Sequence, residues 1–274
     1  IVDAITQQQF KGNSAAVVPL QQWLSPEVMQ NIAAENKLSE TAFIRGLSAN
    51  KYEIRWFSPL TEIDFCGHAT LASAYVIFML QPELPEIRFS TGAVGDLSVS
   101  RTGDWLQMSF PKRLASPVAE IPAALLQGLG AEPLQVLRSD QAWFAIYADA
   151  ATVASLTPDM QQLKQLGPWD VVVTAPGTGF VPETPATQDN PDAAPQYDFI
   201  SRYFWPANGG DEDPVTGSIH AGLTPYWAEL LGKNQLLAYQ ASTRGGVLRL
   251  EISGDRVLVS GQAVLYLKGE IEVG

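Results

Sequence analysis

The sequence predicts an α+β protein built from two similar lobes, and three observations support this class. A glycine-containing turn opens an apolar helix at two places, residues 66–70 and 213–220. An aromatic strand candidate that ends at a proline precedes each turn, over residues 52–59 and 197–206, as in a diverged internal repeat. Further strand candidates recur between few helices.

The first lobe is expected to contain one surface helix and one buried helix among its strands. Ser25 and Pro26 mark the start of the surface helix, because serine suits the N-cap and proline the first helical position. Residues 69–80 are apolar on every side, as a buried helix must be. Strands are expected at residues 1–5, 15–18, 51–58, 86–90, 94–100 and 105–110.

Pro111 marks the end of the first lobe. We therefore place the lobes at residues 1–112 and 113–261, with the last strand, within 262–274, returning to the first lobe. Residues 182–195 are rich in proline and aspartate and predict an exposed loop. In the second lobe, helices are expected at 122–130, 158–166 and 221–231, and strands at 142–147, 169–175, 236–241, 247–252 and 256–260. The last strand is expected at 263–267.

Composition restricts the possible partners. The chain has 274 residues with 46% hydrophobic and 17% charged residues, which is typical of a folded globular protein. Its net charge of -12 repels phosphate backbones and anionic lipids, so neither nucleic acid nor membrane is an expected partner. Cys66 is the one cysteine, which excludes an intramolecular disulfide and favours a cytoplasmic location.

The two glycine turns predict the kind of ligand. A helix start presents backbone N–H groups that attract an anion, so a small carboxylic acid is the expected substrate. The chain has no nucleotide-binding glycine motif, and its two histidines, His68 and His220, exclude a three-histidine zinc site. A mixed metal site with Asp213 or Glu62 stays open, but no metal and no cofactor are expected.

Four motifs occur in a characteristic order along the chain. They are GNS at residues 12–14, SETAF at 39–43, FCGHAT at 65–70 and GGDEDPVTGSIHAGL at 209–223. Together they resemble the PhzF-type isomerase and epimerase family, the phenazine-biosynthesis-like relatives of diaminopimelate epimerase. The resemblance implies two pseudo-symmetric lobes, each a mixed, mostly antiparallel sheet wrapped around a central helix. It also implies an active site in the cleft between the lobes, and a homodimer.

The resemblance also implies roles for individual residues. Glu40 would be the general acid and base that takes a proton from one carbon and returns it at another. His68 and Asp213 would orient the substrate, and Ser218 would bind its carboxylate. The remaining residues expected to bind substrate are Asn13, Ser39, Gly67 and Gly217.

Several alternatives remain on sequence grounds. Cys66 stands where the two-thiol epimerases have their first cysteine, but Pro214 lies near the place of the second, which excludes the two-thiol mechanism. The leading hypothesis is a cofactor-independent isomerase of a small carboxylated substrate, cyclic amino acids included. A racemase or epimerase that uses Glu40 with Cys66 or Asp213, and a catalytically silent binding protein, are the alternatives.

The candidate residues could also have purely structural roles. His68 could cap its own helix, Asp213 could be a loop acid, and Ser218 could satisfy backbone donors in a first helical turn. Cys66 is expected to be a packed side chain and His220 a structural one.

Overall fold

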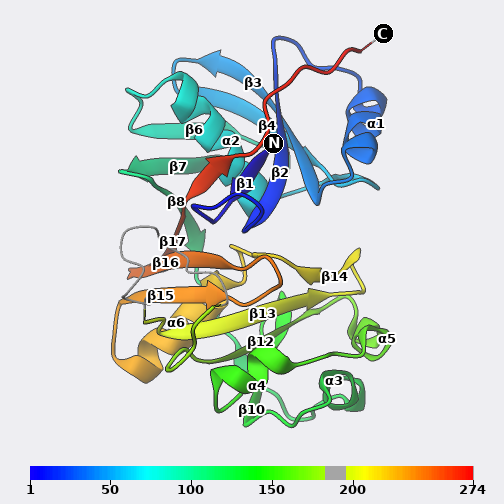
Figure 1. The fold of residues 1–274 in the computed structure, drawn as a ribbon, viewed down its shortest axis with the longest axis vertical. Helices are drawn as coiled ribbons and strands as arrows, with labels where there is room; N and C mark the ends of the chain where they lie inside the picture. The colour runs from blue at the N-terminus through cyan, green and yellow to red at the C-terminus, as the bar shows by residue number, and fades with distance from the viewer. Residues whose placement is uncertain (183–195, 274) are drawn as a thin grey trace. The chain divides into compact units, whose positions relative to one another are not determined.

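The computed structural model describes residues 1–182 and 196–273, so most of the loop predicted at 182–195 lies outside the described residues. The chain divides into two compact units (Figure 1). Unit 1 comprises Ile1–Ser109 and Ser260–Gly274, and unit 2 comprises Phe110–Val259.

The sheet of unit 1 is mostly antiparallel with two parallel pairs. Strand β1 (Val2–Ala4) lies between β18 (Ala263–Leu265) and β2 (Asn13–Leu20), antiparallel to both. Strand β2 runs parallel to β3 (Glu40–Ser48), which pairs antiparallel with β4 (Lys51–Phe57). The other edge of β4 pairs antiparallel with β5 (Glu62–Ile63) and parallel with β6 (Glu86–Ser90). Strands β7 (Leu97–Thr102) and β8 (Trp105–Pro111) follow.

Helix α2 (Gly67–Leu80) is the central helix of unit 1. It contacts β1, β2, β3 and β18, and most of its side chains are buried. Its sequence lacks a polar face because the sheet covers it on several sides. Helix α1 (Pro26–Asn36) packs on β3 and β4, and its N-cap Ser25 Oγ accepts a 3.3 Å bond from the Val28 N–H.

Unit 2 repeats this plan around helix α6 (His220–Leu231) (Figure 1). Strand β11 (Ala142–Ile146) runs parallel to β12 (Asp170–Pro176), which pairs antiparallel with β13 (Phe199–Trp205). Strand β13 pairs antiparallel with β14 (Gly210–Asp213) and parallel with β15 (Gln235–Gln240). The remaining elements are β9 (Ser116–Pro117), β10 (Gln135–Arg138), β16 (Gly246–Ser253), β17 (Arg256–Gly261), α3 (Ala123–Leu129), α4 (Ala150–Ser155), α5 (Met160–Leu163) and the 3₁₀ turn η1 (Lys164–Leu166).

The repeat extends to the strand register. The parallel pair aligns Ala15 with Glu40 in unit 1, and Ala142 with Asp170 in unit 2. The following hairpin strands carry the same ion pair in each unit, Arg55 with Glu62 and Arg202 with Glu212. The two units therefore share one plan down to individual pairing positions.

The predicted α+β class is confirmed, and the differences concern short elements. Both acidic loops pair as strands, β5 and β14, because an aromatic strand offers each a free edge. The sequence analysis missed α4 and β10, which are too short to show a clear period. Among the described residues, no helix has the length and hydrophobicity that a membrane span requires.

Candidate active site

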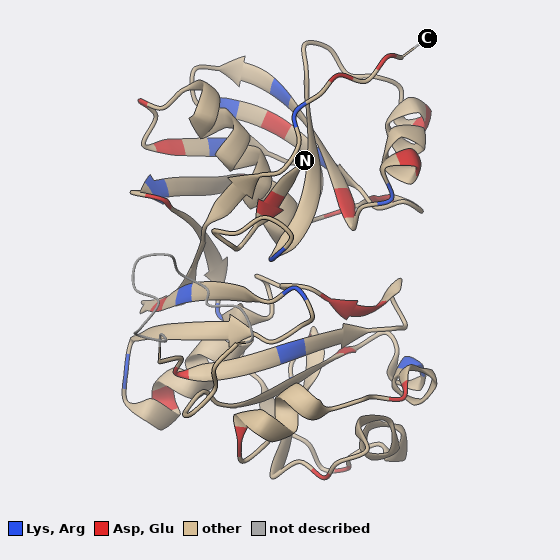
Figure 2. Ribbon diagram, in the orientation of Figure 1, with Lys and Arg blue, Asp and Glu red and all other residues tan. Residues whose placement is uncertain are grey.

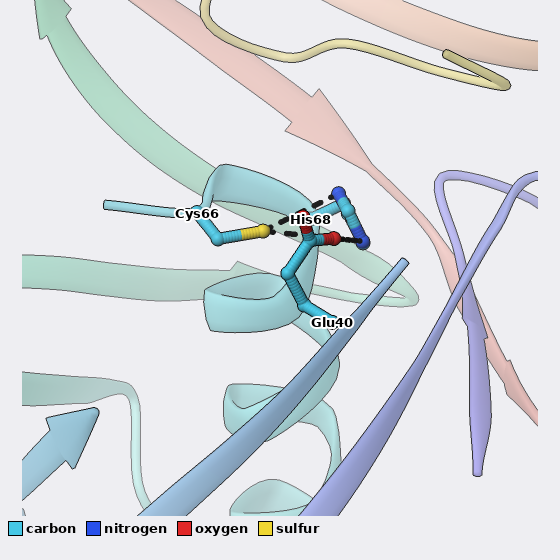
Figure 3. Close-up of side chains that lie close together, drawn as sticks. All are labelled: Glu40, Cys66 and His68. Atoms are coloured by element: carbon cyan, nitrogen blue, oxygen red, sulfur yellow. Dashed lines mark hydrogen bonds and ion pairs between the residues drawn. The ribbon is translucent and has the colours of Figure 1, made fainter. Parts of the chain in front are cut away.

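Glu40, Cys66 and His68 form a buried cluster in unit 1 (Figure 3). Glu40 is the first residue of β3, and its Oε2 atom lies 3.0 Å from Nε2 of His68. The Cys66 Sγ atom lies 3.5 Å from Nδ1 of the same imidazole. Glu40 and His68 are each 7% exposed, so the carboxylate is not solvated as a strand-end acid usually is.

The start of α2 places two of these side chains. Cys66 has an extended backbone as the N-cap, and Gly67 begins the helix. The Thr70 hydroxyl donates a 2.6 Å bond to the Cys66 carbonyl, which fixes the first turn. The imidazole of His68 contacts Glu40, and the N-cap residue Cys66 makes no side-chain cap hydrogen bond.

The electrostatics of the cluster favour a charged pair. Burial lowers the pKa of His68, but Cys66 and Glu40 outweigh it and hold that pKa well above its ordinary value of 6.5. Burial is the main cause that raises the pKa of the Cys66 thiol to about 11, and the Glu40 charge adds to it. The raised pKa of His68 favours an imidazolium next to Glu40, and the raised pKa of Cys66 favours a neutral thiol.

The same three side chains are the described group that could hold a metal ion, since their ligand atoms lie within 4.8 Å of one another. Metal binding requires a thiolate and a neutral imidazole. In the metal-free protein a metal ion would compete with protons for these ligands, because the pKa of His68 is raised and that of Cys66 is about 11.

Asn13 and Ser39 lie at the same end of the parallel pair as Glu40. Ser39 directly precedes Glu40, and its hydroxyl donates a 3.4 Å hydrogen bond to Oδ1 of Asn13. Asn13 is fully buried and pairs with Ala4 at the start of β2. The structure therefore brings together all the residues that the sequence predicts for this part of the site, with Gly67 next to His68.

The residues predicted in unit 2 lie around the start of α6. Asp213 ends β14, which is red over most of its length in Figure 2, and its carboxylate accepts a hydrogen bond from the Thr216 hydroxyl. Gly217 and Ser218 form a turn whose carbonyls accept 3.2 Å and 3.1 Å bonds from the amides of His220 and the next residue. Because α6 begins at His220, Gly217 precedes the helix, whereas Gly67 is the first residue of its own.

Gln240 holds this turn from β15. Its Nε2 donates a 2.8 Å bond to the Asp213 carbonyl, and its Oε1 accepts a 2.9 Å bond from the Thr216 amide. The His220 Nδ1–H donates a 2.8 Å bond to the Thr216 carbonyl. Burial lowers the pKa of His220 to about 4, so this histidine is neutral and fits a structural role.

Three further side chains are linked to Ser218 by hydrogen bonds. They are not among the site residues predicted from the sequence. The Gln141 Nε2 donates to Ser218 Oγ at 3.1 Å and to the Tyr203 hydroxyl at 3.0 Å. Tyr203 in turn donates to the carboxylate of Asp170. A signal existed in the sequence, since Asp170 stands at the start of a strand after a helix, as Glu40 does.

The family model described as phenazine biosynthesis-like protein (PhzC-PhzF) matches residues 2–269. The chain belongs to the phenazine biosynthesis-like, or PhzC-PhzF, family.

Relatives and solved structures agree with this assignment. An uncharacterized isomerase of Pseudomonas aeruginosa is 44% identical and covers 99% of this chain and 97% of its own. The crystal structure of a PhzF family protein from Enterococcus faecalis has a TM-score of 0.89 at 40% identity, covering 100% of this chain and 98% of that one. A predicted epimerase from Pseudomonas aeruginosa shares the fold at 18% identity, with a TM-score of 0.69 and coverage of 100% and 98%.

Proposed function

We propose that the protein is a cofactor-independent isomerase that moves a proton on a small carboxylated substrate, with Glu40 as general acid and base. The observation that carries the proposal is the buried Glu40 carboxylate 3.0 Å from the imidazole of His68. The relatives named isomerases support the reaction class.

In the proposed reaction, Glu40 removes a proton from an acidic carbon of the substrate. The electron pair of that C–H bond shifts a double bond, and Glu40 returns the proton at another carbon, so no electrons are gained or lost overall. The His68 cation would stabilise the negative charge that develops on the substrate. The first amides of α2 offer donors for the carboxylate of the substrate.

The other residues predicted from the sequence are proposed to bind the substrate. Asn13, Ser39 and Gly67 would do so next to Glu40, in keeping with their places at the end of β2 and β3 and at the start of α2. Asp213, Gly217 and Ser218 are the proposed contributors from unit 2.

A racemase or epimerase is the second candidate, and the geometry of unit 1 argues against one form of it. Bases on opposite faces of one carbon must be separated by about 6 Å, twice the reach of a proton transfer. Glu40, Cys66 and His68 keep their ligand atoms within 4.8 Å of one another. Glu40 with Cys66 therefore does not make a two-base pair, which leaves Asp213 as the partner that an epimerase would need.

Solvent deuterium incorporation tests the proposal. A panel of small carboxylic acids is incubated in D₂O with wild type, Glu40→Gln and Cys66→Ala, and deuterium on carbon is followed by mass spectrometry and NMR. We expect one acid to exchange with wild type and Cys66→Ala but not with Glu40→Gln. The matched control is Glu53→Gln, a partly exposed carboxylate on β4 that pairs with Arg45.

Each other result has a meaning for the alternatives. Exchange that persists in Glu40→Gln would refute Glu40 as the base. Exchange that disappears in Cys66→Ala would show that the thiol is required and would contradict Glu40 as the sole base. Tight binding of an acid without exchange in the wild type would favour the silent binding protein.

A cytoplasmic location and a homodimer stay predictions. The neutral, buried thiol of Cys66 is compatible with a reducing compartment. Sedimentation of the purified chain would decide the oligomeric state.

A further inference from the structure

Asp170 occupies in unit 2 the place that Glu40 occupies in unit 1. Each is the first residue of the strand that runs parallel to its neighbour, at the same register position. Glu40 contacts His68, and Asp170 connects to Ser218, both of which directly follow the glycine of the turn. The carboxylate at this strand position is therefore linked, in both units, to the residue that follows the glycine of the turn. The link is direct in unit 1 and runs through two side chains in unit 2.

The hydrogen bonds of unit 2 determine where each proton points. Tyr203 has one hydroxyl proton and donates it to Oδ2 of Asp170, so its oxygen can only accept from Gln141. This requires Gln141 to present its NH₂ group, and the second N–H of that group points to Ser218 Oγ at 3.1 Å. Ser218 then accepts from Gln141, and its own proton is left to donate to another group.

The surroundings hold this chain of bonds in place. Asn208 Nδ2 donates a 2.7 Å bond to the other oxygen of Asp170, which fixes the carboxylate. Tyr203 is 4% exposed. Gln141 Oε1 is buried without a hydrogen-bond partner among the described residues, so the amide is bound through its NH₂ side alone. Burial raises the pKa of Asp170, and burial together with the Asp170 charge raises the pKa of Tyr203, which keeps the phenol proton in place.

We propose that Asp170 is a positioning residue that acts through Tyr203 and Gln141 to aim the Ser218 hydroxyl as a donor at the carboxylate of a small acid. The inference deepens the proposed function, on which it rests for the chemical class of the ligand. It assigns to unit 2 a carboxylate-binding donor whose direction depends on a residue two side chains away.

Acetate, the smallest carboxylate, is the probe. Backbone amide signals of Gly217 and Ser218 are followed by ¹⁵N NMR while acetate is added to the full chain, with acetamide as the uncharged control. The variants are Asp170→Asn and Tyr203→Phe. Tyr203→Phe removes the hydroxyl from the chain of bonds, and Asp170→Asn leaves one acceptor oxygen where the carboxylate accepts from both Tyr203 and Asn208. The matched control is Tyr197→Phe, because Tyr197 is also buried in unit 2 and its hydroxyl has no partner among the described residues.

We expect acetate to shift both amides in the wild type and in the control. In the two network variants the dissociation constant for acetate should rise about fivefold, the equivalent of one net hydrogen bond. The acetamide response should be small and equal in all four proteins. A general loss of structure in a variant would change this response as well. Thermal unfolding confirms that each variant folds, and Tyr203→Phe serves if Asp170→Asn does not.

Two results would overturn the inference: no acetate shift at Gly217 and Ser218 in the wild type, or equal acetate affinity in the network variants and the control. The titration needs no turnover. Absence of deuterium exchange would therefore count against the proposed isomerase without deciding the acetate result.

Discussion

The ion pair of Glu40 and His68 makes a prediction about stability and pH. The atoms Oε2 and Nε2 are 3.0 Å apart, and the side chains are 9% and 7% exposed. At an effective dielectric constant of about 20, Coulomb's law gives roughly 5 kcal/mol for such a pair. Desolvation offsets part of this, and glutamine keeps a hydrogen-bond acceptor, so Glu40→Gln should lower the free energy of unfolding by about 3 kcal/mol at pH 6.

The pH dependence follows from the raised pKa of His68. Its stabilising contribution is fully present below pH 6.5, the unfolded value, and is lost as the pH rises through the folded pKa, which lies well above 6.5. The difference between wild type and Glu40→Gln should therefore shrink at high pH. Urea unfolding from pH 6 to 10 measures this difference, and a difference that stays constant or grows with pH would refute the charged pair.

Further predictions concern the second histidine, the thiol and the repeated ion pair. His220 has a folded pKa of about 4, so stability should fall by about 3 kcal/mol between pH 6.5 and pH 4, and His220→Asn should lack this fall in urea unfolding. Cys66, with a pKa of about 11, is roughly 0.1% thiolate at pH 8, and mass spectrometry should show far slower labelling by iodoacetamide than for glutathione. Arg202→Met should lower the free energy of unfolding by about 1–3 kcal/mol, because the two side chains of its ion pair are only 12% and 20% exposed. Arg55→Met should lower it by less than about 1 kcal/mol, because the side chains of that pair are 28% and 41% exposed. Equal losses in urea unfolding would contradict this reasoning.

The motifs of unit 1 allowed more of the site to be predicted than those of unit 2. Glu40 and His68 lie within two short motifs, so the resemblance pointed to both, and the structure adds their contact and places Cys66 beside them. Gln141 and Tyr203 lie outside the four motifs, and Gln141 meets Tyr203 and Ser218 only through the pairing of distant strands. Sequence periodicity gives the face of a strand but not its register, so it could not bring these side chains together.

The repeat also places different groups at the same strand position in the two units. In unit 1 the carboxylate of Glu40 at this position contacts His68, which can carry a charge, so the pair has a proton to exchange. In unit 2 the same position is occupied by the shorter Asp170, which accepts hydrogen bonds from Tyr203 and Asn208. Its link to Ser218 runs through the neutral side chains of Tyr203 and Gln141. A serine hydroxyl can orient an anion but does not change its charge near neutral pH. The two units therefore carry different chemical groups at this position, although both follow the same plan of strands.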